Sequence, residues 1–310
     1  MNLEPEERNG YYISAEMKKV WSIEMQLVKK LLEVCEKHNL RIWAEGGTLL
    51  GTIRENGFIP WDDDIDMAMM RDDYDKLQAL AKDEFKPPYF FQSGYTDKFA
   101  NGFTRVRMNG TTAITLSSIY RNCHQGIFID LFPLDILPDD ENSRNIFIQE
   151  KEKKRQELKY SIDNCFSFTN WKYNCVILKS KIKTGIKGFH SCFKEYDQYV
   201  KQFWTSNNHQ VSLISWIFEE RYLREKEWYT DTIYLPFENI MMPVPGNYDA
   251  ILKTQFGDYM KPVKTPTMHG GFAALDPDHS YCDYLPILRR KKRKEAISFF
   301  LERCKVIKLH

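Results

Sequence analysis

The stretch IPWDDDIDMAMM, from Ile59 to Met70, places four aspartates within five positions and then continues with apolar residues. Carboxylates that lie side by side raise one another's pKa, so this crowding carries a cost in free energy. From Asp64 onward, acidic and apolar residues alternate with the period of two that β-strands show. Asp64 and Asp66 are therefore expected on one face of a strand, roughly 6 to 7 Å apart, while the apolar residues anchor the other face.

This pair of carboxylates predicts a site for a divalent cation, because Mg²⁺ and Mn²⁺ bind oxygen ligands and offset the repulsion. Two other interpretations fit the aspartates taken alone. Asp62, Asp64 and Asp66 match positions 1, 3 and 5 of an EF-hand calcium loop, but Met67 stands where that loop needs glycine. The second is a solvated acidic turn in front of a strand, which is common for exposed aspartates.

The residues around the acidic stretch favour the cation site. A short strand is expected at RIWAE (41–45) and a short helix at TLLGTIR (48–54), separated by Gly46 and Gly47. A helix that opens at glycines can receive phosphate oxygens on its free amides. A Gly-Gly turn between strand and helix, followed by an Asp-x-Asp strand, is the order of a nucleotidyltransferase site. Asp130, in the apolar stretch GIFIDLF, supplies a third carboxylate.

The rest of the chain divides into a part with strands and a part with helices. Ser14 is expected to cap a helix that extends to about His38, because apolar residues recur there at spacings of three and four. A second helix, RDDYDKLQALAKDEF, is expected to be capped by Asp72 or Asp73. Further strands are expected at PYFFQ, FTRVRM and GIFIDLF, whereas residues 140 to about 230 have a helical, lysine-rich composition.

These elements predict an α/β (α+β) fold with strands confined to the first half of the chain. Residues 1–140 are expected to form a nucleotidyltransferase-like core with a mixed sheet, and residues 141–232 an inserted, mostly helical region. Residues 233–310 would complete the catalytic region and end in a basic helix.

Charge and composition limit the classes of protein and of partner. The formal net charge is +1, but residues 41–100 hold 12 acidic and 7 basic residues, a balance of −5. Residues 285–310 hold 9 basic and 2 acidic residues, a balance of +7. The first ten residues lack the apolar core of a signal peptide, no apolar run reaches the ~18 residues of a membrane span, and the seven cysteines include no Cys-x2-Cys pair. We therefore expect a cytoplasmic protein with reduced thiols.

A longer block of sequence carries a resemblance to a known family. AEGGTLLGTIRENGFIPWDDDIDMAMMRDDYDKL, residues 44–77, resembles the signature of the LicD family of phosphocholine transferases, which includes fukutin-related ribitol-phosphate transferases. FTRVRMNGTT, GIFIDLFPLD, PVPGNYDAILKTQFGDYM and PTMHGG resemble later blocks of that family, in the expected order. The resemblance implies transfer of phosphocholine, or a related alcohol phosphate, from a CDP-linked donor such as CDP-choline. The acceptor would be a hydroxyl of a glycan or lipid-linked glycan, and CMP would be released.

The resemblance also implies roles for individual residues. Asp64 and Asp66 would hold Mg²⁺ or Mn²⁺ at the diphosphate of the donor, and Asp62 would be a further ligand. Asp130 would be either another metal ligand or the base that takes the proton of the hydroxyl. Residues expected to bind substrate or phosphate are Gly46, Gly47, Thr48, Arg54, Arg105, Arg107 and His269. A solvated strand edge is the alternative for the two arginines of FTRVRM, and a structural role is the alternative for the histidine.

The basic C-terminus has two interpretations. The six consecutive basic residues Arg289–Lys294 precede EAISFFLERCKVIKL, whose apolar residues form one stripe of a helix. Such a helix could rest on an anionic membrane and place the protein on its inner face. The alternative is a charged face packed on its own domain. No nucleic-acid motif accompanies the charge, so no nucleic-acid partner is expected.

Two other functions are compatible with the same residues. A true nucleotidyltransferase would release pyrophosphate and join a nucleotide to its substrate. A catalytically inactive protein could keep the fold and bind ligands, although Asp64, Asp66 and Asp130 are all present.

Overall fold

The chain folds around one mixed β-sheet. The computed structural model describes residues 1–163, 170–215, 218–264 and 271–307, with side chains as far as Glu295, and within these residues the sheet has seven strands. The strands of this sheet are β3 (Trp43–Ala44), β4 (Asp66–Met70), β5 (Tyr89–Gln92), β6 (Thr104–Met108), β8 (Phe128–Ile136), β9 (Gln210–Ser212) and β10 (Arg224–Glu225). This mixed sheet, combined with helices, confirms the predicted α+β class.

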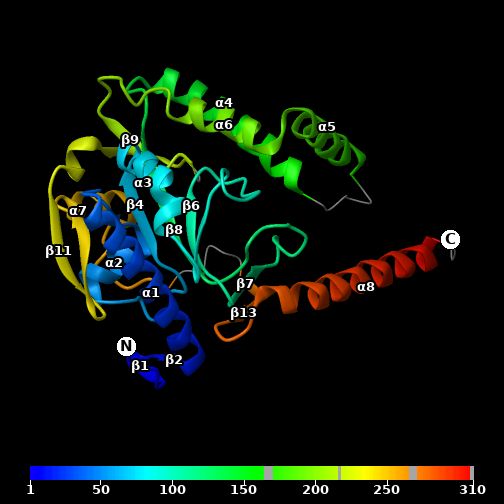
Figure 1. Cartoon of the computed structure of the whole chain (residues 1–310), viewed down its shortest axis with the longest axis horizontal. Helices are drawn as coiled ribbons and strands as arrows, with labels where there is room; N and C mark the ends of the chain where they lie inside the picture. The colour runs from blue at the N-terminus through cyan, green and yellow to red at the C-terminus, as the bar shows by residue number, and fades with distance from the viewer. Residues whose placement is uncertain (164–169, 216–217, 265–270, 308–310) are drawn as a thin grey trace.

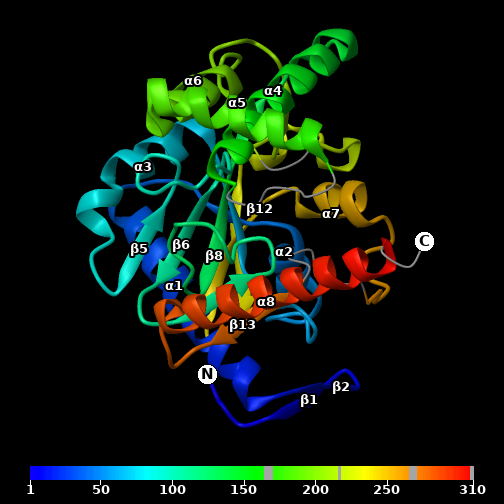
Figure 2. The same ribbon diagram turned by 90° about the vertical axis from the view of Figure 1, so that its right-hand side faces the viewer.

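Helices cover the sheet and extend beyond it (Figure 1). They are α1 (Ala15–Lys37), α2 (Gly46–Arg54), α3 (Arg71–Glu84), α4 (Glu141–Ile162), α5 (Trp171–Lys187), α6 (Phe189–Val200), α7 (Tyr248–Phe256) and α8 (Tyr281–Ile307). Helices α4, α5 and α6 lie together on the side of the sheet opposite the N-terminal hairpin, and α8 projects away from the sheet (Figures 1 and 2). Among the described residues, no helix is both long and apolar enough to span a bilayer.

Strand β8 is the centre of the sheet, and all nine of its residues are buried. One edge pairs in parallel with β4, while the other pairs antiparallel with β6 near its start and with β9 near its end. A strand buried in this way needs a nearly continuous apolar sequence, which FIDLFPLDI provides apart from Asp130 and Asp135. Each of these two acids has a buried or half-buried arginine partner.

Several predicted elements are confirmed. The side chain of Ser14 caps α1 by accepting a hydrogen bond from the amide of Met17, and the helix ends at Lys37. The expected short helix and strands correspond to α2, β3, β5, β6 and β8. The predicted cap of α3 is wrong, because Met70 stands at the cap position and Asp73 lies in the first turn instead. The carboxylate of Asp73 accepts from the amide of Arg41 at 3.1 Å, so it joins α3 to β3.

The prediction that strands are confined to the first half of the chain is wrong. Strands β9 and β10 are only three and two residues long, too short to show a period of two. Three further pairs of strands form separate two-stranded sheets: β1 (Glu6–Arg8) with β2 (Tyr11–Ile13), β7 (Thr112–Thr115) with β13 (Phe272–Asp276), and β11 (Thr232–Phe237) with β12 (Ile240–Pro245). Prolines within β11 and β12 conceal their strand character, although a sheet of two strands tolerates them because each has an unpaired edge.

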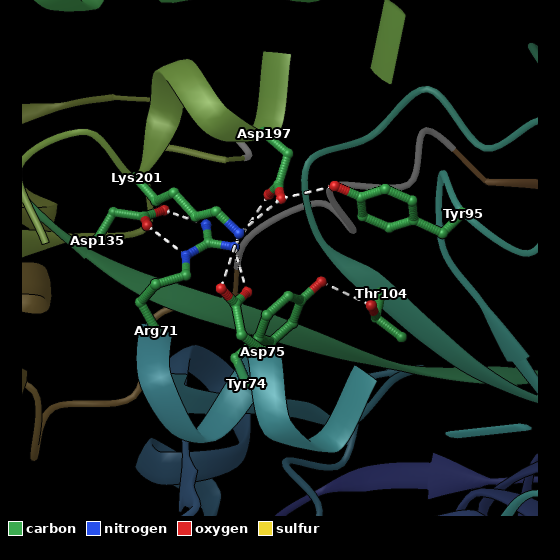
Figure 3. Close-up of polar contacts among 8 residues, drawn as sticks. All are labelled: Arg71, Tyr74, Asp75, Tyr95, Thr104, Asp135, Asp197 and Lys201. Atoms are coloured by element: carbon green, nitrogen blue, oxygen red, sulfur yellow. Dashed lines mark hydrogen bonds and ion pairs between the residues drawn. The ribbon is translucent and has the colours of Figure 1, made fainter. Parts of the chain in front are cut away.

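A buried ionic network joins the helical layer to the sheet (Figure 3). The Arg71 guanidinium, which is 1 % exposed, donates to both oxygens of Asp135 at 2.6 and 2.7 Å and to Asp197 of α6 at 3.2 Å. The hydroxyl of Tyr95 donates to Asp197 at 2.9 Å, and Lys201 bonds Asp75 at the exposed side of the network. Burial raises the pKa of Asp135 to about 6, and the bonds from Arg71 act in the opposite direction.

Candidate functional site

Three neighbouring strands place two acids and one arginine in a row. Asp66 begins β4 and is the register partner of Asp130 on β8, and Asp130 is in turn the partner of Arg105 on β6. Side chains opposite one another on paired strands lie on the same face of the sheet. Arg105 donates to both oxygens of Asp130, at 2.6 and 3.2 Å, and its guanidinium lies 3.8 Å from the ring centre of Phe128. The row therefore consists of a half-buried acid, Asp66, beside the fixed ion pair of Asp130 and Arg105.

The aspartate loop lies beside this row. Asp62, Asp63 and Asp64 each offer a carboxylate oxygen within 4.8 Å of the others, an arrangement that could hold a metal ion. Strand β4 begins at Asp66, so Asp64 precedes the strand rather than lying on it as expected. The indole of Trp21 donates to the backbone oxygen of Asp62 at 3.1 Å, which fixes the loop against α1.

The two glycines allow the aspartate loop to approach helix α2. Gly46 has φ of +53°, and a Cβ atom there would lie 3.3 Å from Oδ2 of Asp66. A Cβ atom at Gly47 would overlap Oδ2 of Asp62. Any other residue at position 47 would have to displace that carboxylate, and position 46 also needs the left-handed backbone that glycine adopts without strain. The Gly-Gly turn and the acidic loop are thus one structural unit.

Backbone hydrogen bonds hold Asp66 in place. Its amide donates to Oγ1 of Thr48 at 2.8 Å, and its carbonyl accepts from the amide of Glu45 at 2.9 Å. The amide of Asp130 donates to the carbonyl of Ile65 at 2.9 Å. Thr48, which the sequence assigned to phosphate binding, therefore also fixes the start of β4.

A further carboxylate approaches the aspartates from α1. Glu24 is only 2 % exposed, and its Oε2 has no hydrogen-bond partner. Burial raises the pKa of Glu24 well above its ordinary value, and the charges of Asp64, Asp63, Asp62 and Asp66 raise it further. An unpartnered buried carboxylate oxygen among other acids is costly unless a cation compensates it.

The electrostatics of the aspartates agree with a cation site. Burial raises the pKa of Asp62 well above its ordinary value, and Asp64 and Asp63 add to the effect. The pKa of Asp66 is also raised well above its ordinary value, first by burial and then by Asp64 and Asp130. A divalent cation would reverse these shifts because it favours the ionised carboxylates. The clustered oxygens, the unpartnered oxygen of Glu24 and the glycine turn fit such an ion.

Comparison with known proteins identifies the part of the chain that holds these residues. Residues 39–180 match the family described as LicD/FKTN/FKRP, nucleotidyltransferase domain. The match includes the Gly-Gly turn, the aspartate loop, Asp130 and Arg105. Residues 39–180 belong to the LicD family.

One curated relative extends this similarity over most of the chain, and another matches a short part of it. The lipopolysaccharide cholinephosphotransferase LicD of Haemophilus influenzae is 28 % identical over 270 residues, which cover 79 % of this chain and 93 % of that protein. Human ribitol 5-phosphate transferase FKRP is 34 % identical over 55 residues, which cover 18 % of this chain and 11 % of that protein. Both relatives are transferases of a phosphorylated alcohol by their names.

The three arginines that were expected to bind phosphate lie in different places in this LicD-family domain. Arg105 lies in the row with Asp66 and Asp130, as described above. Arg54 ends α2, about 12 Å along the helix from the glycines, and its side chain bonds Glu55 and the carbonyl of Tyr259. Arg107 is buried, and it bonds Oε1 of Gln92 and the carbonyl of Gly126. His269 lies outside the described residues.

The pKa of Arg107 is lowered in its buried position. Burial, together with the neighbouring charge of Arg105, lowers the pKa of Arg107 to about 9. Its guanidinium lies 4.7 Å from the ring centre of Phe128, the same ring that Arg105 contacts. The two arginines therefore share a strand face, as their spacing of two residues requires, but Arg105 alone of the two is partly exposed, at 13 % of its side chain.

Sequence reasoning missed a second group of residues, which supports the LicD-family site from beyond its matched range. Arg224 of β10, which is 1 % exposed, donates to both oxygens of Glu45, the residue before Gly46. It also donates to Oε1 of Gln255 on α7 at 2.9 Å and to the hydroxyl of Tyr229 at 2.5 Å. The amide group of Gln255 lies 3.9 Å from the position of a Cβ atom at Gly46. Residues of the C-terminal part thus hold the glycine turn.

Proposed function

We propose that the protein transfers phosphocholine, or a related alcohol phosphate, from a CDP-linked donor to a hydroxyl of a glycan, with release of CMP. The observation that carries this proposal is the row Asp66–Asp130–Arg105 beside the glycine turn at the start of α2. Family membership and the LicD relative from Haemophilus influenzae support transfer of an alcohol phosphate. CDP-choline is the donor that this likeness favours.

We further propose that Mg²⁺ or Mn²⁺ is the cofactor. Asp62 and Asp64, which lie with Asp63 in the carboxylate cluster, would hold the ion together with Asp66 at the start of β4, and Glu24 would contribute negative charge from α1. When bound, the ion would neutralise negative charge on the diphosphate and on the departing CMP. The support for this proposal is the fit of the oxygen-rich cluster, because hard divalent cations take carboxylate oxygens.

The residues of the chain have separate tasks in this reaction. The acceptor oxygen forms a bond to the phosphorus that carries the alcohol, the bond from that phosphorus to the CMP oxygen breaks, and the hydroxyl proton moves to a base. Arg105, held by Asp130, offers a fixed positive charge beside Asp66 for the donor's phosphates. The backbone amides at the start of α2 would also donate hydrogen bonds to the phosphate oxygens. Because both oxygens of Asp130 already accept from Arg105, we favour a positioning role for it over that of the base.

A single assay tests this function against both rivals. The protein is incubated with a panel of CDP-alcohols, a choline-free glycan acceptor and Mg²⁺, and the released nucleotide is identified. We expect CMP, with no pyrophosphate formed when CTP replaces the donor. Pyrophosphate release would establish a true nucleotidyltransferase. Binding of a CDP-alcohol with no release of CMP from it in the presence of any acceptor, and with equal binding by Asp66→Asn, would establish an inactive binding protein.

A further inference from the structure

Helix α5 carries apolar residues on its solvent-facing side. Trp171 is 70 % exposed, Leu178 53 %, Ile182 55 % and Ile186 81 %, and Cys175 between them is also exposed. These five residues follow one another at spacings of four, three, four and four, so they form a single stripe along the helix. Soluble helices normally place polar residues on the exposed side.

The packed side of α5 lies opposite this stripe. Ile177 and Ser180 are buried, and α5 packs against α4, where Tyr173 donates to Asp163 at 2.8 Å. At about 100° per residue, these two positions lie roughly 100° to 160° around the helix from Leu178 and Ile182. The stripe therefore serves no packing purpose among the residues that the structure describes, and α4 together with α6 already forms an apolar cluster without it.

The charge of α5 is one-sided. The helix WKYNCVILKSKIKTGIK contains five lysines and no acidic residue, a balance of +5. Lys183 pairs with Glu157 of α4, and Lys187 pairs with Glu195 of α6. All four of these side chains are about half exposed, so the pairs are weak and exchange readily with other anions. An apolar stripe flanked by lysines fits a surface with an apolar interior and negatively charged groups at its boundary with water.

The C-terminal helix α8 is a weaker candidate for contact with such a surface. Arg289, the first residue of its basic run, donates to the carbonyls of Ile119 and Arg121 at 2.7 and 3.1 Å. Part of the basic charge of α8 is therefore used to dock that helix on the protein itself. The stripe expected at Ile297–Cys304 belongs to side chains beyond those described.

We propose that α5 lies in the surface of an anionic membrane, with the stripe from Trp171 to Ile186 buried among the lipids and its lysines at the phosphate groups. Helix α5 lies in the layer across the sheet from the N-terminal hairpin, so this side of the molecule would face the bilayer (Figure 1). The inference depends on neither the donor nor the acceptor proposed above. It assigns membrane contact to the inserted helical layer.

Vesicle sedimentation tests the proposal. The full chain is mixed with vesicles of phosphatidylcholine alone or of an equal mixture with phosphatidylglycerol. We expect binding to the mixed vesicles, weak binding to phosphatidylcholine, and loss of binding at high salt. The triple variant Leu178→Ser, Ile182→Ser, Ile186→Ser should lower the partition coefficient at least about tenfold, because apolar burial and lysine attraction act together. Ile146→Ser on α4, equally exposed at 65 % but alone, is the matched control and should bind like the parent.

A fluorescent label locates the contact. In a background with Cys123, Cys165, Cys282 and Cys304 replaced by serine, an environment-sensitive dye on the exposed thiol of Cys175 should shift to shorter wavelength with mixed vesicles. Equal vesicle binding by the triple variant and the parent would overturn the proposal. An unchanged dye spectrum when the protein is bound to vesicles would also overturn it. If neutralising Arg290–Lys294 then abolished vesicle binding, the contact would lie on α8. A parent that sediments as a dimer without lipid, and becomes monomeric in the triple variant, would show instead that the stripe binds a second copy of the chain.

Discussion

Asp66 connects the parts of the candidate site. Its carboxylate lies against Gly46, its amide is bonded to Thr48, and its strand partner is Asp130. A carboxylate in this position has its pKa raised well above the ordinary value, so its ionised form is stable only with compensating positive charge. The burial and neighbouring acids that raise the pKa of Asp66 are the features that the proposed divalent cation would compensate.

Asp66→Asn should separate catalysis from stability. The amide keeps the size of the side chain but cannot neutralise a cation, so we expect CMP release to fall on the order of 100-fold or more. Because the substitution removes a half-buried charge that lies close to Asp64 and Asp130, the melting temperature without metal should stay equal or rise. Asp83→Asn, an exposed acid on α3, is the control and should change neither quantity. Turnover that survives in Asp66→Asn would remove this residue from the reaction.

Glu24→Gln tests the carboxylate that approaches from α1. We expect the dissociation constant for Mg²⁺ or Mn²⁺, measured by calorimetry without substrate, to rise about tenfold, because one negative charge leaves the site. The metal-free protein should melt at a higher temperature, since its unpartnered buried oxygen is replaced by a neutral amide. Glu36→Gln makes the same chemical change at an exposed position of α1. If Glu24 were only structural, metal affinity would match that of the Glu36 variant.

At the scale of elements, His124 joins β5, the loop before β8 and the start of α8. Its ring stacks on Phe90 and packs against Tyr281, both at 4.9 Å between ring centres. Nδ1 accepts from the amide of Gly126 at 3.2 Å, which leaves Nε2 to donate to Oδ1 of Asn109 at 3.0 Å. The neutral ring therefore fits this site, and a proton on Nδ1 would displace the Gly126 bond.

His124 predicts a pH dependence of stability. Burial lowers its pKa to about 4, with Arg107 adding to the effect, whereas the unfolded chain has the ordinary value of about 6.5. The unfolded state thus binds the proton first as the pH falls, and stability is lost between about pH 6.5 and 4. In His124→Asn, whose Oδ1 can replace Nδ1 as acceptor, that loss should shrink by roughly 1 kcal/mol. Urea unfolding at pH 7 and pH 5 measures it. Parallel curves for the two proteins would contradict the prediction.

The elements nearest the acidic stretch follow directly from sequence because their determinants are local. Ser14 caps α1, the glycines open α2, and Asp130 lies on the strand that was expected to supply it. Glu24 and Arg224 could not be found in this way. Glu24 stands within an ordinary helical pattern, and Arg224 begins a two-residue strand 179 residues from its partner Glu45. Contacts of this kind depend on tertiary packing, to which single-chain periodicity carries no signal.

At the scale of the whole molecule, two buried arginines connect the second half of the chain to the sheet. Arg224 ties β10 and α7 to Glu45, just before the glycine turn. Arg71 ties the helical layer to the far end of β8, at Asp135 (Figure 3). Each arginine is bidentate to a carboxylate that is almost fully buried, so neither partner can be removed without leaving a charge in the interior. The layer proposed to touch the membrane is therefore held to the strand that carries Asp130.

Arg71→Met is expected to loosen that connection. The variant leaves Asp135 and Asp197 without their guanidinium, and loss of one member of a buried ion pair costs about 3 to 5 kcal/mol of unfolding free energy. Urea denaturation measures this loss, and limited proteolysis should show cleavage within α4–α6 before the sheet. Adding Asp135→Asn should restore part of the stability, because it removes the uncompensated charge. Lys201→Met, at the rim of the same network with 32 % of its side chain exposed, should cost about 1 kcal/mol or less. Equal losses for Arg71→Met and Lys201→Met would mean that the network does not hold the helical layer to the sheet.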